Sequence, residues 1–300
     1  MAKTQKKAKN AEEKPFSLIS DEKLLNIYAA MLKCRLLEQR ATELFQHGKL
    51  DRDFHASSGR EATSAAAVID LEPADTLCLA PGDWLPAFVK GLTPETLFRV
   101  LAPTPSQVGE VVEIEAARKN ILYGSPDDDF TDAVLDRASA AASARNNAVA
   151  LAFIPSGSLA QWQNSIQVSA TKKLPAIFVQ YLEPSNTDSS SRPQNPAALV
   201  HGVPSIAVDA LDPVAVYRVV YEAIVRARQL RGATLLQCIL PSQPAEFEAG
   251  KAIRPEILHD PVVSMEHYLR GKGIEAEAHK PGILSAFNHD LDLAIRFLHR

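Results

Sequence analysis

Residues 149–181 read VALAFIPSGSLAQWQNSIQVSATKKLPAIFVQY, and this stretch decides the fold class. Two continuous apolar runs, 149–154 and 175–181, flank a segment, 158–172, whose apolar residues recur at helical spacing. Continuous apolar runs are typical of strands in a parallel sheet that is covered on both faces. The stretch therefore predicts a strand–helix–strand unit with parallel pairing and a right-handed crossover.

The same alternation extends to both sides of this unit. Further buried strands are predicted at 75–80, 206–208 and 234–239. Helices are predicted at 21–45, 58–69, 213–230, 261–269 and 290–298, and Gly48 is the stop signal that follows the first of them. The small residues Ala62, Ala65 and Ala66 favour close packing of the second helix against another element. The fold expected is α/β: a doubly wound, mostly parallel sheet flanked by helices, with a long N-terminal helix. Segment 103–132 gives no clear prediction.

Composition and net charge limit the classes of protein to which the chain can belong. The chain has 300 residues, 46% hydrophobic content and a formal net charge of −4, so neither a nucleic-acid-binding field nor a membrane span is expected. Residues 1–16 are predicted to be a disordered, Lys-rich tail, and 17–300 a single domain with a C-terminal helical extension. The three cysteines lack metal-ligand spacing, which favours free thiols in a reducing cytoplasm. The acidic run 127–129 could bind a hard cation, but a solvated loop is the preferred interpretation.

Several stretches, in this order, resemble the alpha subunits of pyruvate and branched-chain 2-oxo acid dehydrogenases. They are LLNIYAAMLKCRLLEQRATELFQHGKL (24–50), DFHASSGREATSAAAVIDLEPADTL (53–77), KKLPAIFVQ (172–180), HGVPSIAVDALDPVAVYRVVYEAIVRAR (201–228) and DPVVSMEHYLRGKGI (260–274). Each motif alone is weak, and their joint order makes the resemblance specific. The resemblance implies a thiamine diphosphate-binding-type fold, with thiamine diphosphate and Mg²⁺ held between this subunit and a beta-type subunit.

The family's magnesium motif is altered here. A diphosphate needs a hard cation held by oxygen ligands, together with backbone N–H donors at a helix start. Where the family has Gly-Asp-Gly, this chain has Pro155, Ser156 and Gly157, so the aspartate charge and one N–H donor are lost. Where the family has an Asn-Asn pair, the chain has Leu182 and Glu183. Ser156, Gly157, Glu183 and Asn186 are therefore interpreted as vestigial cofactor-binding positions, without a predicted metal site.

A second part of the implied site also departs from the family. The resemblance places a Tyr-Arg pair and a His at Pro81, Gly82 and Trp84. Glycine cannot bind phosphate as arginine does, and an indole cannot transfer a proton as histidine does. His55 matches a family position near the 2-oxo acid, as a relic of the substrate site or as a polar loop residue. No residue is predicted to be catalytic.

These departures favour a catalytically degenerate alpha-like subunit with a structural or regulatory role, paired with a beta-type subunit or with itself. The alternative is an active, divergent thiamine diphosphate-dependent 2-oxo acid dehydrogenase that passes an acyl group to a lipoyl carrier, with Glu183, Asn186 or a partner chain supplying magnesium ligands. A third hypothesis is a binding module in which Trp84, Trp162 and His55 line a drier pocket, although core positions are preferred for the tryptophans. A serine hydrolase using Ser156 or Ser158 is disfavoured, because the Gly-x-Ser-x-Gly pattern is missing.

Overall fold

A parallel sheet of six strands organises the computed structural model, which describes residues 19–50, 59–80, 82–102, 107–124, 130–144, 146–155, 158–182, 200, 202–241 and 260–297. The strand order is β2-β1-β3-β4-β6-β5, and every pair of neighbouring strands is parallel. The strands are β1 (Thr76–Leu79), β2 (Ile121–Tyr123), β3 (Ala150–Ile154), β4 (Ala176–Leu182), β5 (Ser205–Asp209) and β6 (Thr234–Ile239). The predicted α/β class and parallel pairing are confirmed.

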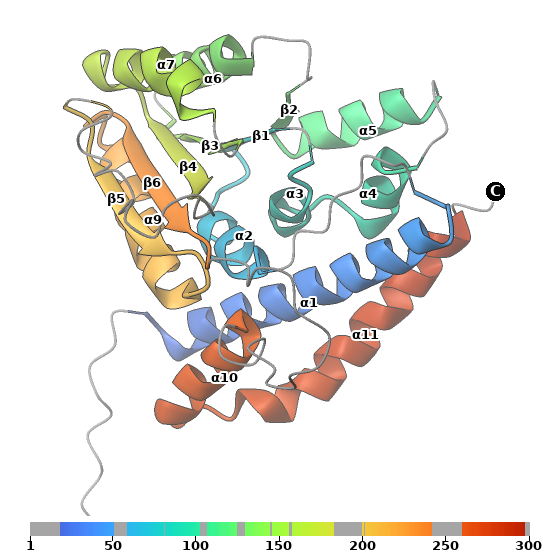
Figure 1. The fold of residues 1–300 in the computed structure, drawn as a ribbon. Coiled ribbons are helices and arrows are strands. Elements are labelled where there is room, and N and C mark those ends of the chain that lie inside the picture. Colours follow the sequence, from blue (N-terminus) through green and yellow to red (C-terminus); the bar gives the residue numbers. More distant parts are fainter. Residues whose placement is uncertain are drawn as a thin grey trace, which may run out of the picture.

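Helices cover both faces of the sheet (Figure 1). One face packs against α6 (Phe130–Ala144) and α7 (Leu159–Thr171). The other packs against α1 (Asp21–Gln46), α2 (Glu61–Val68) and α9 (Pro213–Arg228). The remaining helices are α3 (Leu85–Lys90), α4 (Pro94–Val100), α5 (Gln107–Arg118), α10 (Pro261–Gly271) and α11 (Ala276–Phe297). Figure 1 shows α11 running beside α1 at the edge of the molecule farthest from α6 and α7.

The predicted helix boundaries have the expected capping groups. The Ser20 side chain accepts a hydrogen bond from the backbone N–H of Lys23, and Gly48 adopts a φ of +68° just after the end of α1. Asp212 and Asp260 each accept two backbone N–H hydrogen bonds at the starts of α9 and α10. These caps satisfy donors that the first helical turn leaves without intrahelical partners, so short sequence signals fixed the ends of these helices.

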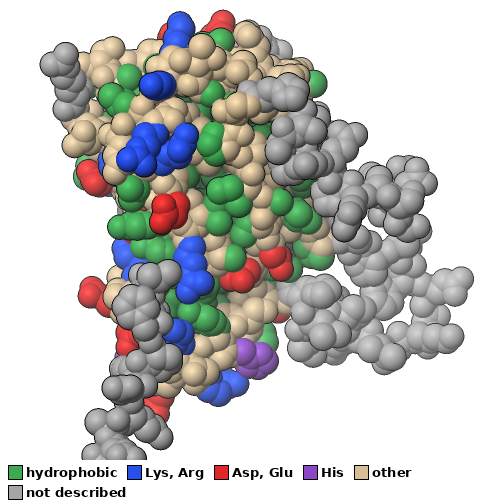
Figure 2. All heavy atoms as spheres, turned by 90° about the vertical axis from the view of Figure 1, so that its left-hand side faces the viewer, with side chains coloured by type: hydrophobic (Ala, Val, Ile, Leu, Met, Phe, Trp, Pro, Cys, Tyr) green, Lys and Arg blue, Asp and Glu red, His purple; other side chains and the backbone are tan. Residues whose placement is uncertain are grey.

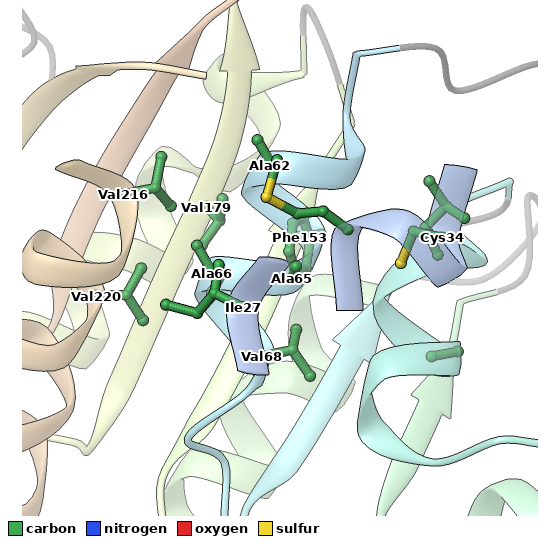
Figure 3. Packing of buried hydrophobic residues seen from close by; sticks show 14 of the residues in the cluster. Ile27, Cys34, Ala62, Ala65, Ala66, Val68, Phe153, Val179, Val216 and Val220 are labelled. Atoms are coloured by element: carbon green, nitrogen blue, oxygen red, sulfur yellow. The ribbon is translucent and has the colours of Figure 1, made fainter. Parts of the chain in front are cut away.

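Helix α2 lies at the centre of the α1–α9 side of the core. Every one of its residues is buried, and its small side chains allow α1, α3 and α9 to approach it closely. Figure 3 shows Ala66 of α2 next to Ile27 of α1, with Val216 and Val220 of α9 on the same side as Ile27. The close packing predicted from the alanines is thus confirmed.

Several elements escaped the sequence analysis. Segment 103–132, which gave no prediction, contains α5, β2 and the start of α6, and the C-terminal helix begins at Ala276 instead of residue 290. Strand β2 has only three residues, too few to show a period. The early part of α11 contains Pro281, which argues against a helix in a sequence although the structure tolerates it. The acidic run 127–129 and the predicted tail 1–16 lie outside the described residues.

Asp75 ties the amino ends of the strands together. Its side chain is fully buried, and its carboxylate accepts hydrogen bonds from the backbone N–H groups of Glu72 (2.7 Å) and Val149 (2.9 Å). Arg228, at the end of α9, pairs with both carboxylate oxygens, at 3.1 and 2.8 Å. A single carboxylate therefore joins the entry to β1, the entry to β3 and the end of α9.

Candidate functional site

The carboxyl ends of β1 and β3 enclose the position where this topology places a ligand. From β1 the chain continues outward to β2, whereas from β3 it continues in the opposite direction to β4. In open parallel sheets, ligands bind outside the carboxyl ends of the strands at such a reversal of strand order. The two segments leaving these strands are 80–84 and 155–158, which contain the positions that the sequence analysis singled out.

The turn after β3 is closed by its own backbone and one side chain. The Ser158 hydroxyl donates a hydrogen bond to the carbonyl of Pro155 at 2.7 Å, and the Ser158 N–H contacts the same carbonyl at 3.2 Å. Pro155 carries no N–H, so it cannot donate to a bound anion. The Ser158 hydroxyl is thus committed to a structural turn, which gives the serine hydrolase hypothesis no support.

The segment after β1 places a carboxyl group at this edge of the sheet. Gly82 has a φ of +89°, a backbone conformation that side-chain-bearing residues rarely adopt. Asp83 follows, with a side chain only 12% exposed. Burial raises the pKa of this carboxyl to about 6, and the opposing effect of Arg60 is smaller. Trp84, the next residue, is 3% exposed and belongs to the α1–α9 side of the core.

Arg60 brings a cation to the same place from the start of α2. Its guanidinium lies 3.6 Å from the Asp83 carboxylate and stacks over the ring of Tyr181, 4.6 Å from the ring centroid. The stretch 53–77 resembles a family segment that reads Gly-Gln-Glu-Ala where this chain has Gly59, Arg60, Glu61 and Ala62, so the arginine departs from that motif. Sequence reasoning missed Arg60 because only the fold brings residue 60 beside residues 83 and 181.

Two tyrosines complete the cluster. Tyr123 ends β2 and Tyr181 is near the end of β4, and both lie on the sheet face that α2 covers. Burial, reinforced by the nearby Asp83 charge, raises the pKa of both phenols, so both stay protonated. We refer to Arg60, Asp83, Tyr123 and Tyr181 as the Arg60 cluster. It contains one cation, one anion and two neutral phenols.

The predicted site residues are only partly covered by the structure. His55, Ser156, Gly157, Glu183 and Asn186 lie outside the described residues, and so does Pro81. Leu182 is described and forms the last residue of β4.

The hypothesis that the two tryptophans line one pocket is wrong. Trp84 belongs to the core on the α1–α9 face, whereas Trp162 packs against Phe130 and Phe178 on the opposite face. The sheet separates them, and the preferred assignment of both to the core is confirmed.

The described part of the chain contains neither a candidate metal site nor a candidate reactive cysteine. Its His, Cys, Asp and Glu side chains form no group of three that could hold a metal ion. Cys34, Cys78 and Cys238 are free and buried, and burial raises the pKa of each thiol, which disfavours the reactive thiolate. Of the described helices, none is long and apolar enough to cross a bilayer.

Comparisons with known proteins agree with this architecture. The model of the dehydrogenase E1 component family matches residues 28–240, which span most of the sheet and its helices. The chain belongs to the dehydrogenase E1 component family. Its relatives include the pyruvate dehydrogenase E1 component subunit alpha of Porphyra purpurea, 25% identical over 93% of this chain and 89% of that protein. The corresponding alpha subunit of Staphylococcus aureus is also 25% identical, over 93% of this chain and 78% of that protein.

A solved structure is related more remotely. An X-ray structure assigned to a thiamin diphosphate-dependent enzyme of Mycobacterium smegmatis matches 64% of this chain and 33% of that chain, at 14% identity and a TM-score of 0.40. So weak an overlap carries no argument about the site. The alpha-subunit resemblance seen in the sequence is confirmed by the family match and by the curated relatives.

The described residues do not fit a magnesium diphosphate. Pro155 offers no N–H, Leu182 offers no oxygen from its side chain, and position 82 has no side chain to bind phosphate. The one cation of the cluster, Arg60, is already opposed by Asp83 at 3.6 Å. The electrostatic attraction for a multiply charged anion is weak at a site where a carboxylate offsets the positive charge of the arginine.

Proposed function

We propose that this member of the E1 component family is a catalytically degenerate alpha-like subunit with a structural or regulatory role, and that it does not hold thiamine diphosphate and Mg²⁺ by itself. The observation that carries the proposal is the Arg60–Asp83 pair beside Gly82. Where the family resemblance calls for an arginine that binds phosphate, the chain presents a cation opposed by a buried carboxyl group. No chemical step is assigned to the cofactor.

A partner subunit is part of the proposal. The relatives named above are alpha subunits of an E1 component, and we infer a beta-type subunit or a second copy as the partner here. Figure 2 shows hydrophobic side chains spread over the side of the molecule that β5 and α9 form in Figure 1. Ile206 of β5 and Tyr221 of α9 are exposed, at 37% and 49%. Exposed apolar surface on an edge strand and its helix is typical of a surface that another chain covers.

The proposal extends to organisation and location. We place residues 17–300 in a single domain with α10 and α11 as its C-terminal extension, supported by the packing of both helices against α1. A cytoplasmic location is supported by the three free thiols.

Calorimetric titration with thiamine diphosphate and Mg²⁺ tests the loss of the cofactor site. The chain alone should give no saturable heat, since Asp83 opposes the charge of Arg60, Pro155 offers no N–H group for the diphosphate and Leu182 offers no side-chain oxygen for its Mg²⁺. Saturable binding that is lost in Glu183→Ala would refute the proposal and establish the active, divergent 2-oxo acid dehydrogenase instead. The same titration in the presence of a beta-type subunit shows whether a partner restores binding.

Light scattering after size exclusion tests the partner. The chain has a mass of 32.6 kDa, and we expect either a species of at least twice this mass or a stable complex with a co-expressed beta-type subunit. A monodisperse monomer that also fails to bind a beta-type subunit would contradict the structural role.

A further inference from the structure

Strand β5 has a hydrogen-bonding edge with which no described strand pairs. It comes last in the strand order, and within the described part of the chain its one neighbour is β6 (Figure 1). The carbonyl of Pro204 and the N–H of Ala210 each bond to β6 at 2.9 Å. In a parallel pair the backbone groups of alternate residues face the neighbouring strand. The N–H and C=O groups of Ser205, Ala207 and Asp209 therefore point away from the sheet.

The sequence of β5 lacks the features that usually prevent edge strands from pairing. Such strands commonly carry a lysine, a proline or a bulge. Strand β5 reads SIAVD, without lysine or proline, and its register with β6 is continuous. Val208 packs on the α9 side of the sheet, so Ile206 lies on that side and Ala207 on the other. Both Ile206, 37% exposed, and Ala207 are open to solvent, and neither is charged.

We propose that β5 pairs antiparallel with β5 of a second copy of this chain, about a twofold axis at Ala207. The inference rests on the partner role proposed above and names the second copy as that partner. In this register Ala207 faces Ala207 of the partner subunit, and Ser205 faces Asp209 of the partner subunit. All three outward residues then exchange both backbone hydrogen bonds with their opposites. A shift of two residues would leave one of the three without an opposite.

The backbone and side chains of β5 agree with such self-pairing. The Asp209 carbonyl accepts from the Asp212 N–H at 3.2 Å and keeps a second lone pair for the partner. Because Asp209 falls opposite a serine, no like charges face each other across the new pair. On the α9 side, Ile206 lies beside Val208 of the partner subunit, in a pair whose side chains approach closely, so its exposed apolar surface is covered. A twofold interface requires a surface complementary to itself, which β5 provides.

Light scattering on the full chain tests this inference through a charge exchange at the axis. At about 100 μM, the parent chain should have twice its 32.6 kDa mass. Ala207→Lys and Ala207→Glu each place two like charges opposite each other, so each should raise the dissociation constant of the dimer at least about tenfold. An equimolar mixture of the two variants should recover the dimer, because a lysine then faces a glutamate. That pattern requires residue 207 to pair with itself.

Ala117→Lys and Ala117→Glu are the matched controls. Ala117 is an exposed alanine of α5, which contacts β2 at the opposite edge of the sheet, so both variants should keep the mass of the parent. Hydrogen exchange gives a readout that requires no substitution. The N–H groups of Ser205, Ala207 and Asp209 should exchange slowly in the dimer and faster on dilution, because only the second copy protects them.

Three results would overturn the inference. They are a parent chain that stays monomeric at this concentration, lysine and glutamate variants that dimerise as the parent does, and a mixture that does not recover the dimer. A beta-type subunit that occupies the β5 edge in place of a second copy would overturn it as well. The proposed function would survive these outcomes, since the thiamine diphosphate titration does not depend on β5 and a bound beta-type subunit would still support a structural role.

Discussion

Removal of the Asp75 carboxylate should be among the most destabilising single changes in this chain. The carboxylate accepts four hydrogen bonds, two from backbone N–H groups and two from Arg228. In Asp75→Ala, the buried Val149 N–H loses its partner and the Arg228 guanidinium, only 19% exposed, loses its buried counter-charge. Breaking a buried ion pair from one side costs about 3–5 kcal/mol, a large share of the ~5–15 kcal/mol that holds a typical domain folded.

Glu72→Ala provides the matched control for this change. The Glu72 carboxylate pairs with the same arginine, Arg228, at 3.1 Å, but its side chain is 64% exposed. An exposed pair contributes about 0–1 kcal/mol, so the control should unfold almost as the parent does. Asp75→Asn should fall between them, because one amide oxygen still accepts while the amide nitrogen faces two donors.

Urea unfolding followed by circular dichroism measures all three variants against the parent. Asp75→Ala should be the most destabilised variant, Asp75→Asn the next and Glu72→Ala the least. The slope of the free energy of unfolding against urea concentration should be the same in all three. If Asp75→Ala lies within about 1 kcal/mol of Glu72→Ala, the carboxylate does not tie the strands together as the structure indicates.

Three further changes test other parts of the structure. The folded-state pKa of Asp83 is raised from 3.8 to about 6, so its contribution favours folding below pH 4 and is lost as the pH rises to about 6. Asp83→Asn should therefore gain on the order of 2–3 kcal/mol relative to the parent between pH 4 and pH 7, and parallel pH profiles in urea unfolding would refute this. Ala65→Leu should cost about 1–3 kcal/mol by overpacking fully buried α2, whereas the same substitution at half-buried Ala30 should cost less in the same assay. Arg35→Met should cost about 3–5 kcal/mol by leaving the Glu61 carboxylate, 1% exposed, without its cation, and Glu61→Gln in the same chain should recover part of this loss; no recovery would contradict that reasoning.

The sequence by itself determined the parallel α/β class, five of the six strands and the helices α1, α2, α7, α9 and α10, but it missed α3 and α4. It determined the former features because they are local: an apolar run, a 3.6-residue period, an Asp-Pro start or a glycine at φ > 0 is visible within a few residues. It also determined the family, since the scaffold motifs occur in the right order from the first helix to the Asp-Pro helix. The three-residue strand β2 and the proline-containing α11 fell below that local signal.

Only the tertiary structure decided which charges meet. Arg60, Asp83, Tyr123 and Tyr181 come from four elements, and nothing in their spacing shows that they share the carboxyl edge of the sheet. The same holds for Asp75 and Arg228, which are separated by 153 residues and meet at the opposite edge. Coulomb energy and desolvation depend on distance and burial, which the folded chain alone defines. For this reason the sequence could locate the positions that depart from the family motifs, whereas only the structure shows that Arg60 and Asp83 lie side by side.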